Sequence, residues 1–543
     1  METSTTPSNV VEGEQPTQNL NMTILTGRRL AVAFTAMLLS VLVMALDQTI
    51  LATALPRIAS DFDAFTLQGW VSTSFLLAQA VFLLPYGQLL RIFSAKWMLF
   101  ISIVIFQLGS LVCGVGQNMN HLIAGRTVSG LGAAGIWVAM FQVMYQVTRL
   151  EDRPRLFGIF GAVFQISVVL GSIIGGAFTS NLSWRWCFFI NLPVGFVSLV
   201  GVFFLLESSP PIGADPTKRS WPDLLRQVSE MDFIGVLLIS SALTTLVLAL
   251  QWGGNQKPWN DKAVIICLVL AVLLTAALIV WEKRLGDKAM SPTAIFHSLS
   301  IYAMMLYTFL LRFCFLLFSF YIPIYYQAAR EHSAIKSGVD LLPFLIGVSV
   351  AILGAAQIIS WMKFYWHLLV LSPIFVAVGS GLIVGLGVGT GMQTALLALQ
   401  FEFNSPKTIQ LIGQATSLAT LFQLLGGTIG LAVATPVLSS TLSTNINTNA
   451  PAAPADIVSI IRDSPTSIYT DQRVPSALIP GIVRAYTGSL KVVFVLGVPV
   501  AGLALLSAMF MHRIRIGEQG PLEETDIQAK DEEVGVEEDK PGG

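Results

Sequence analysis

The stretch Leu30–Leu51, LAVAFTAMLLSVLVMALDQTIL, decides the fold class, because its 22 residues are mostly apolar and carry one charge, Asp47. A helix needs about 20 mostly apolar residues to cross a bilayer. The whole chain of 543 residues has the same character, with 54% hydrophobic and 12% charged residues, whereas soluble domains carry about 25% charged residues. The sequence therefore predicts an all-α polytopic membrane protein and excludes a soluble multidomain protein and a disordered chain.

Stretches of similar length recur along the chain. One of them, 364–401, is too long for one ordinary helix and short for two helices with a connection, so 13 or 14 spans remain open. The four cysteines lie in or beside apolar stretches and the five histidines show no metal-ligand spacing, so we expect no disulfide framework, metal site or cofactor. The other predicted spans lie near 30–51, 70–90, 97–116, 122–145, 158–179, 187–206, 232–252, 263–282, 301–327, 339–361, 411–438 and 488–511.

The lysines and arginines between the predicted spans indicate the orientation, because cytoplasmic loops carry an excess of both. With the N-terminus inside, 14 of these residues up to Lys363 fall on the cytoplasmic side and 6 on the other side. The formal net charge of −1 gives no basic surface for nucleic acid. The sequence has no phosphate-binding GxxxxGKS or GxxxxGKT loop, so we expect an ion gradient or passive transport rather than ATP-driven pumping.

Three ionisable residues lie inside predicted spans, where charged groups are costly and mark functional sites by default: Asp47, Arg126 and Arg312. Counting along the helices places Asp47 about 25 Å from Leu30 and Arg126 about 7 Å below the outer surface, so these two residues could pair. Asp47 is the candidate for proton coupling, against the alternative of an interfacial helix-end carboxylate. Arg126 could also tether backbone carbonyls, and Arg312 either faces a watery cavity or pairs with an unidentified carboxylate.

Glycines cluster in TVSGLGAAG, residues 127–135, and in LGSIIGGAF, residues 170–178, and small residues let membrane helices approach closely. Tyr321 and Tyr325 lie near the end of the predicted span 301–327, where they belong either to an interfacial aromatic belt or to a cavity for a flat ligand. The glycines expected at helix-packing or gating contacts are Gly130, Gly132, Gly171, Gly175, Gly176, Gly426 and Gly430.

Four segments together resemble the major facilitator superfamily, in particular its fourteen-span drug/proton antiporter branch with the fungal toxin and multidrug efflux carriers. They are LDQTILATALP (Leu46–Pro56), Arg126 with the glycines that follow it, WRWCFFINLPVG (Trp184–Gly195) and GQATSLATLFQLLGGTIG (Gly413–Gly430). The resemblance covers roughly residues 30–510. It implies two six-helix bundles around a central cavity, with two additional helices between the bundles.

The resemblance implies a secondary active transporter, not an enzyme, that exports amphipathic organic compounds such as toxins, secondary metabolites or drugs in exchange for protons. The implied partners are the small-molecule substrate, protons and the lipid bilayer. The expected protein is a monomer in the plasma membrane, with a vacuolar or vesicle membrane as the alternative. Asp47 and Arg126 would couple protons, and the cytoplasmic loop motif comprises Gly87, Arg91 and Lys96. The substrate cavity would include Arg312, Gln48, Tyr321 and Tyr325.

The expected organisation follows from the same resemblance and from the polar ends of the chain. The second bundle would contain an extramembrane loop, 440–486, rich in Pro, Ser and Asn. The expected units are a disordered cytoplasmic tail 1–27, a bundle 28–206, a linker with two helices 207–288, a bundle 289–512 and a disordered acidic tail 513–543.

Three departures from the family pattern leave alternatives open. Arg91 stands where the family usually has Asp, Ser172 stands where its antiport motif usually has Pro, and a segment is missing after Val376–Ile383. The alternatives are an importer or vacuolar carrier of a polar nutrient, such as an amino acid or a siderophore, and a carrier inactivated by the missing segment. The sequence shows no nucleophile–base or metal constellation that would indicate a membrane enzyme.

Overall fold

The computed structural model describes residues 25–514 except for short gaps at 65–66, 150, 212–219, 254–256, 333, 380, 404–407, 452, 455–456, 459–460 and 462–466. Thirteen helices in this part of the chain are long and apolar enough to cross a membrane. The predicted all-α polytopic fold class is therefore confirmed. The predicted tails 1–27 and 513–543 lie almost entirely outside the described residues.

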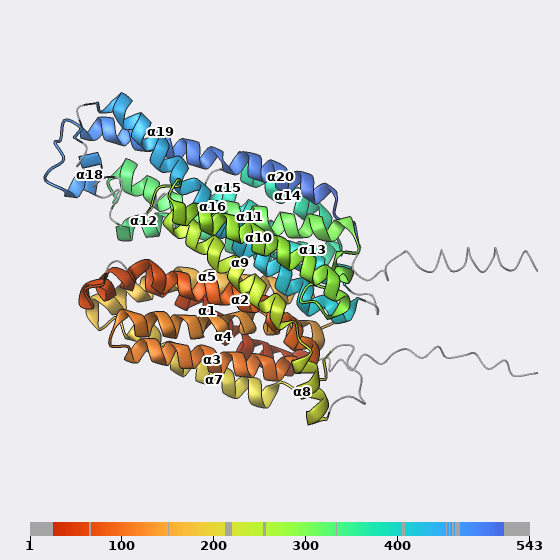
Figure 1. Cartoon of the computed structure of the whole chain (residues 1–543). Helices are drawn as coiled ribbons and strands as arrows, with labels where there is room; N and C mark the ends of the chain where they lie inside the picture. The colour runs from red at the N-terminus through yellow and green to blue at the C-terminus, as the bar shows by residue number, and fades with distance from the viewer. Residues whose placement is uncertain are drawn as a thin grey trace, which may run out of the picture.

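The helices form two bundles that lie side by side (Figure 1). The first bundle contains α1 (Gly27–Asp61), α2 (Gln68–Ile92), α3 (Ala95–Val115), α4 (Met119–Val147), α5 (Arg153–Asn181), α6 (Trp186–Phe189) and α7 (Asn191–Leu205). The connection contains α8 (Trp221–Ser229), α9 (Phe233–Trp252) and α10 (Lys262–Leu285). The second bundle contains α11 (Leu299–Arg330), α12 (Ala334–Asp340), α13 (Leu342–Met362), α14 (Trp366–Val378), α15 (Leu382–Glu402), α16 (Ile412–Asn449), α18 (Ser467–Thr470), α19 (Ile479–Val495) and α20 (Gly497–Met509).

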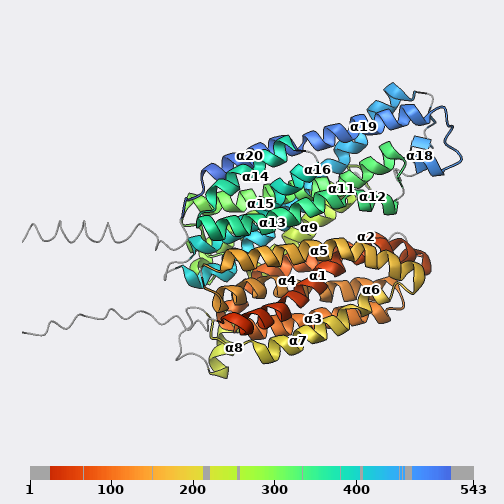
Figure 2. The ribbon, with the colours of Figure 1, turned by 180° about the vertical axis from the view of Figure 1, so that it is seen from behind.

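The two bundles approach each other at one end of the molecule and diverge towards the other end, as two opposite views show (Figure 1 and Figure 2). Helix α8 lies at the first end and helix α18 lies at the second, so we name them the α8 end and the α18 end. The distribution of lysine and arginine along the sequence predicts that the α8 end is cytoplasmic.

The stretch 364–401, which the sequence pattern left open, forms the two helices α14 and α15. The chain reverses at Gly381, whose φ of +52° favours glycine because a side chain would be strained there. Helix α14 has 13 residues and is about 20 Å long, shorter than a bilayer core of about 30 Å. Helix α15 has 21 residues and is long enough to cross. Adding α14 to the thirteen full-length spans gives fourteen segments.

Helices extend from both sides into 440–486, the segment predicted to be an extramembrane loop. Helix α16 continues to Asn449, and α19 begins at Ile479. Hydropathy detects only the apolar part of a helix, whereas the end of α16 is polar. Threonine hydroxyls in this end are satisfied by carbonyls one turn earlier in the same helix. Thr444 donates such a bond to Ser440 at 3.1 Å.

A buried carboxylate joins helix ends of the second bundle at the α8 end. Glu402, at the end of α15, accepts a hydrogen bond of 2.9 Å from Ser298, which precedes α11. The ring of His512, just after α20, lies 2.8 Å from the same carboxylate. Glu402 therefore connects three helix ends outside the cavity region, and we assign it to the architecture of the bundle.

Candidate functional site

Asp47 and Arg126 form a buried ion pair inside the first bundle, between α1 and α4. Their side chains are 0% and 2% exposed. Asn191, at the start of α7, donates a hydrogen bond of 3.1 Å from Nδ2 to Oδ1 of Asp47. Arg126 donates a hydrogen bond to the carbonyl of Val71 on α2, and its guanidinium lies 4.1 Å from the centre of the Phe75 ring. Residues of four helices therefore hold the two charges.

Close packing between α5 and α1 sets the position of Asp47. A Cβ added to Gly171 would lie 2.7 Å from the carbonyl oxygen of Leu46, and Gly175 lies against the carbonyl of Ile50. These contacts lie on either side of Asp47 along α1. Because larger residues would clash with the backbone of α1, the two glycines allow α5 to approach it closely.

The other glycines singled out in the sequence lie at helix crossings, with one exception. Gly130 faces a backbone carbonyl of α2, and Gly132 faces the backbone of α3. Gly426 and Gly430 of α16 face the backbone of α11. A Cβ added to Gly176 would meet no heavy atom within 4 Å, so this glycine faces open space.

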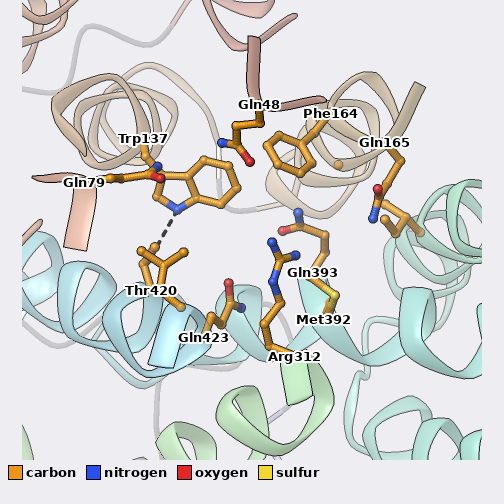
Figure 3. A pocket seen from close by; sticks show the side chains of 13 residues that line it. Gln48, Gln79, Trp137, Phe164, Gln165, Arg312, Met392, Gln393, Thr420 and Gln423 are labelled. Atoms are coloured by element: carbon orange, nitrogen blue, oxygen red, sulfur yellow. Dashed lines mark hydrogen bonds between the residues drawn. The ribbon is translucent and has the colours of Figure 1, made fainter. Parts of the chain in front are cut away.

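A cavity lies between the two bundles and is lined by side chains of both (Figure 3). Gln48 of α1 and Arg312 of α11, two of the residues predicted to line a substrate cavity, lie in its wall. Gln48 directly follows Asp47, so adjacent side chains of α1 reach the cavity and the buried ion pair. The other described lining residues are Gln79, Trp137, Gly161, Phe164, Gln165, Ile352, Met392, Gln393, Thr420, Gln423 and Leu424.

The two tyrosines predicted for the cavity are not among the described residues that line it. Tyr321 is buried, and its hydroxyl shares a hydrogen bond of 3.1 Å with Thr435 on α16. Tyr325 contacts Tyr326 edge-on, with 5.7 Å between the ring centres. Tyr321 lies about 14 Å further along α11 than Arg312. The structure therefore separates these tyrosines from the cavity and places Tyr321 in the packing of α11 on α16.

Four glutamines of the cavity were not predicted, because only charge singled out residues within the spans and the resemblance named only Gln48. Gln79, Gln165, Gln393 and Gln423 are at most 8% exposed. Each has one buried amide atom without a hydrogen-bond partner in the described part of the chain. A buried amide costs free energy unless it is hydrogen-bonded. Glutamine inside an apolar span was therefore the signal that could have found them.

Contacts between the bundles close the molecule at the α8 end. A Cβ added to Gly87 of α2 would lie 2.7 Å from the hydroxyl oxygen of Ser417 on α16. Arg91, one turn further along α2, lies 3.4 Å from a side-chain oxygen of α16. Lys363, after α13, pairs with Glu151, which precedes α5, at 3.4 Å. The bundles are therefore in direct contact on the predicted cytoplasmic side of the cavity.

Lys96 lies away from Gly87 and Arg91, the other two residues of the predicted loop motif. Its ammonium group donates a hydrogen bond of 2.7 Å to the carbonyl of Phe203 on α7. It also lies 5.7 Å from the centre of the Trp97 ring. The motif is thus divided, because Gly87 and Arg91 of α2 contact the second bundle, whereas Lys96 of α3 contacts α7.

Asn191→Leu is expected to destabilise the protein by about 1.5–3 kcal/mol, the usual range for a hydrogen bond to a charged group. The leucine would leave Oδ1 of Asp47 without its donor from α7. Thermal unfolding of the detergent-purified protein measures this loss. Ser198→Ala is the matched control on α7, because Ser198 donates a hydrogen bond of 2.7 Å to an uncharged carbonyl. An Asn191 variant no less stable than the Ser198 variant would contradict the expectation.

Two helical bundles, a cavity between them and a closure at one end are typical of a membrane carrier. The sequence model of the Major Facilitator Superfamily matches residues 37–431. The chain therefore belongs to the Major Facilitator Superfamily, is a multi-pass membrane protein and takes a small-molecule substrate.

Similar proteins agree with this family. The MFS-type transporter astH of Aspergillus oryzae is 33% identical over 508 residues, which cover 90% of this chain and 87% of astH. The MFS-type efflux pump MFS1 of Arthroderma benhamiae is 31% identical over 523 residues, which cover 93% of this chain and 94% of the pump. The crystal structure of the human organic anion transporter MFSD10 (TETRAN) has the same fold, with a TM-score of 0.52 and 14% identity over 90% of this chain and 100% of that one.

Proposed function

We propose that the protein is an efflux transporter that exports amphipathic organic compounds across the plasma membrane in exchange for protons, acting as a monomer. The observation that carries the direction of transport is the similarity to the efflux pump MFS1 along nearly the whole length of both chains. Helices α1–α7 and α11–α20 are the two units that rock against each other around the cavity, as in alternating-access carriers generally.

Asp47 is the proton carrier in this proposal. In the conformation closed at the α8 end, its carboxylate is paired with Arg126 and accepts a hydrogen bond from Asn191. A proton on Asp47 would remove the ion-pair attraction to Arg126 and turn the hydrogen bond from Asn191 into a neutral one, which is roughly half as strong. Helix α1 would then be less tightly held against α4. Because Gln48 is the next residue of α1, a shift at Asp47 would also move the cavity wall.

Asp47→Asn is expected to abolish the response of transport to a pH gradient while the protein stays folded. The assay uses inside-out vesicles that contain the full-length protein and three fluorescent probes of different charge: fluorescein, dansylamide and ethidium. An imposed pH gradient should drive accumulation of at least one probe by the unchanged protein. Asp61→Asn is the matched control, because Asp61 lies at the partly exposed end of the same helix.

Two results would contradict the proposal at different points. Full dependence on the pH gradient in the Asp47→Asn variant would exclude Asp47 as the proton carrier. Vesicles in which the unchanged protein moves none of the probes, or moves them only towards the cytoplasmic side, would contradict proton-driven efflux.

A further inference from the structure

The cavity between the bundles carries an unbalanced positive charge. Arg312 is the one charged side chain among its 13 described lining residues. Within the described chain its guanidinium forms no ion pair, and it lies 4.8 Å from the centre of the Phe315 ring. Arg312 is 13 residues from the start of α11 and therefore about 20 Å along this 32-residue helix. A charge at such depth is costly unless a counter-ion is present.

The nearby intramembrane carboxylate does not supply this counter-ion. Asp47 directly precedes Gln48, which lines the cavity, but the Asp47 side chain pairs with Arg126 inside the first bundle. The two intramembrane arginines therefore differ, because Arg126 has a carboxylate partner and Arg312 has none among the described residues. The sequence left open that Arg312 pairs with a carboxylate, and the described residues contain no carboxylate that does so.

Four glutamines that line the same cavity as Arg312 each have one amide atom without a partner among the described residues. Oε1 of Gln79, Gln165 and Gln393 and Nε2 of Gln423 are buried without a hydrogen-bond partner in the described structure. Gln393 and Gln423 flank the guanidinium of Arg312 (Figure 3). Because a side-chain amide carries both a carbonyl acceptor and an NH2 donor, each glutamine can present either group to a ligand.

The rest of the wall is apolar and aromatic. The indole N–H of Trp137 donates a hydrogen bond of 3.1 Å to the hydroxyl of Thr420, which fixes the ring in the wall. Phe164 meets Trp137 edge-on, with 5.2 Å between the ring centres. Met392 adds a flexible, polarisable side chain that can adapt to different shapes. Such a wall favours a flat, largely apolar molecule.

We propose that this cavity binds organic anions in which a carboxylate or acidic enol group is attached to a flat, largely apolar body. Arg312 binds the anionic group through charge-assisted hydrogen bonds. The amides of Gln393 and Gln423 bind neighbouring carbonyl or hydroxyl groups, and Trp137 and Phe164 cover the ring system. The inference rests on the proposed function, because it names the substrate class for the same cavity. Cationic compounds are disfavoured because the described lining contains no carboxylate.

The test compares three probes of similar shape, naphthoate, naphthamide and naphthylmethylammonium, by isothermal titration calorimetry of the purified full-length protein at neutral pH. We expect naphthoate to bind about tenfold more tightly than the other two, which corresponds to about 1.4 kcal/mol. Arg312→Gln should abolish this preference. Arg312→Lys should keep part of it, because lysine retains the charge but not the bidentate geometry. Arg57→Gln, at the exposed end of α1, is the control that should change nothing.

A second variant tests the role of the Arg312 charge without replacing Arg312 itself. A Cβ added to Gly427 of α16 would lie 3.4 Å from Cγ of Arg312, and Gln423 lies one turn earlier on α16. Gln423→Glu would therefore place a carboxylate beside Arg312 and neutralise it. We expect this variant to lose the preference for naphthoate while its elution on size exclusion stays unchanged.

Several outcomes would overturn the anion site. They are equal affinity for the three probes, a preference for the ammonium probe, binding of none of them, and a preserved naphthoate preference in the Arg312→Gln variant. Export of ethidium by a protein that does not prefer naphthoate would refute the anion site and leave the proposed efflux intact. A naphthoate preference in a protein that moves no probe in vesicles would refute the efflux function alone.

Discussion

Arg126→Leu is expected to destabilise the protein by about 3–5 kcal/mol, because it leaves a buried carboxylate without its counter-ion. Asp47 is 0% exposed, and in the described structure Asn191 would remain as its hydrogen-bond donor. We expect the additional change Asp47→Asn to recover most of this loss, since replacing both members of a buried ion pair by neutral groups is often neutral or stabilising. Thermal unfolding of both single variants and the double variant gives the coupling energy.

Arg185 provides the matched control for this comparison of single and double variants of Arg126 and Asp47. Its guanidinium lies 4.4 Å from the centre of the Trp184 ring and donates hydrogen bonds to the carbonyls of Gly114 and Gly116, but it forms no ion pair among the described residues. Arg185→Leu and Asp47→Asn should therefore have additive effects. A double variant Arg126→Leu/Asp47→Asn no more stable than Arg126→Leu alone would show that the unpaired carboxylate is not the cause.

The same double variant separates stability from coupling. It should fold nearly as well as the unchanged protein, since no unpaired charge remains at the position of the ion pair. In the vesicle assay it should still not respond to a pH gradient, because no ionisable group is left there. A double variant with normal pH-driven efflux would refute proton coupling through Asp47.

Gly87→Leu is expected to open the contact between the bundles at the α8 end. Its side chain would meet the Ser417 hydroxyl and the backbone of Gln414, which lie 2.7 Å and 3.1 Å from an added Cβ. Overpacking of this kind costs about 1–3 kcal/mol. Because this cost applies only to the conformation closed at the α8 end, the ratio of closed to open molecules should fall about 5- to 150-fold. Export should fall as well, because the cycle needs the closed state.

Spin labels on opposite bundles at the α8 end measure this opening. Arg149 and Trp361 are exposed sites on the first and second bundle near the pair of Glu151 and Lys363. In the Gly87→Leu variant the distance between these labels should shift to larger values. Gly69→Leu is the control on the same helix, because a Cβ there would meet no atom within 4 Å. Lost export with unchanged label distances would contradict the opening.

Much of this fold could be predicted from the sequence, because a membrane span is a local property of composition and length. The lengths of individual helices were harder to predict. The polar end of α16 remains helical to Asn449, although hydropathy indicated a loop from residue 440. The stretch 364–401 was ambiguous because α14 is shorter than a bilayer core, and only the reversal at Gly381 separates it from α15.

The residues of the candidate site were also predicted only in part from the sequence. Depth counted along each helix brought Asp47 and Arg126 to a similar level, and the structure pairs them. Four of the five glutamines of the cavity were missed, because an amide raises little signal in a search for charge. Tyr321 was assigned to the cavity or to an aromatic belt, whereas its hydroxyl bonds to Thr435 on α16. The partner that the Tyr321 side chain meets depends on where α16 packs against α11. The sequence of α11 alone does not specify that position.

Hydropathy and charge along the chain were sufficient to place this protein in the membrane and to single out Asp47, Arg126 and Arg312. They could not tell which of these charges has a partner. The tertiary structure pairs the first two within one bundle and leaves Arg312 facing the cavity with none among the described residues. The physical reason is that hydropathy is summed along one helix, whereas the partner of a buried charge comes from another helix. Its presence depends on how the helices are rotated and packed together.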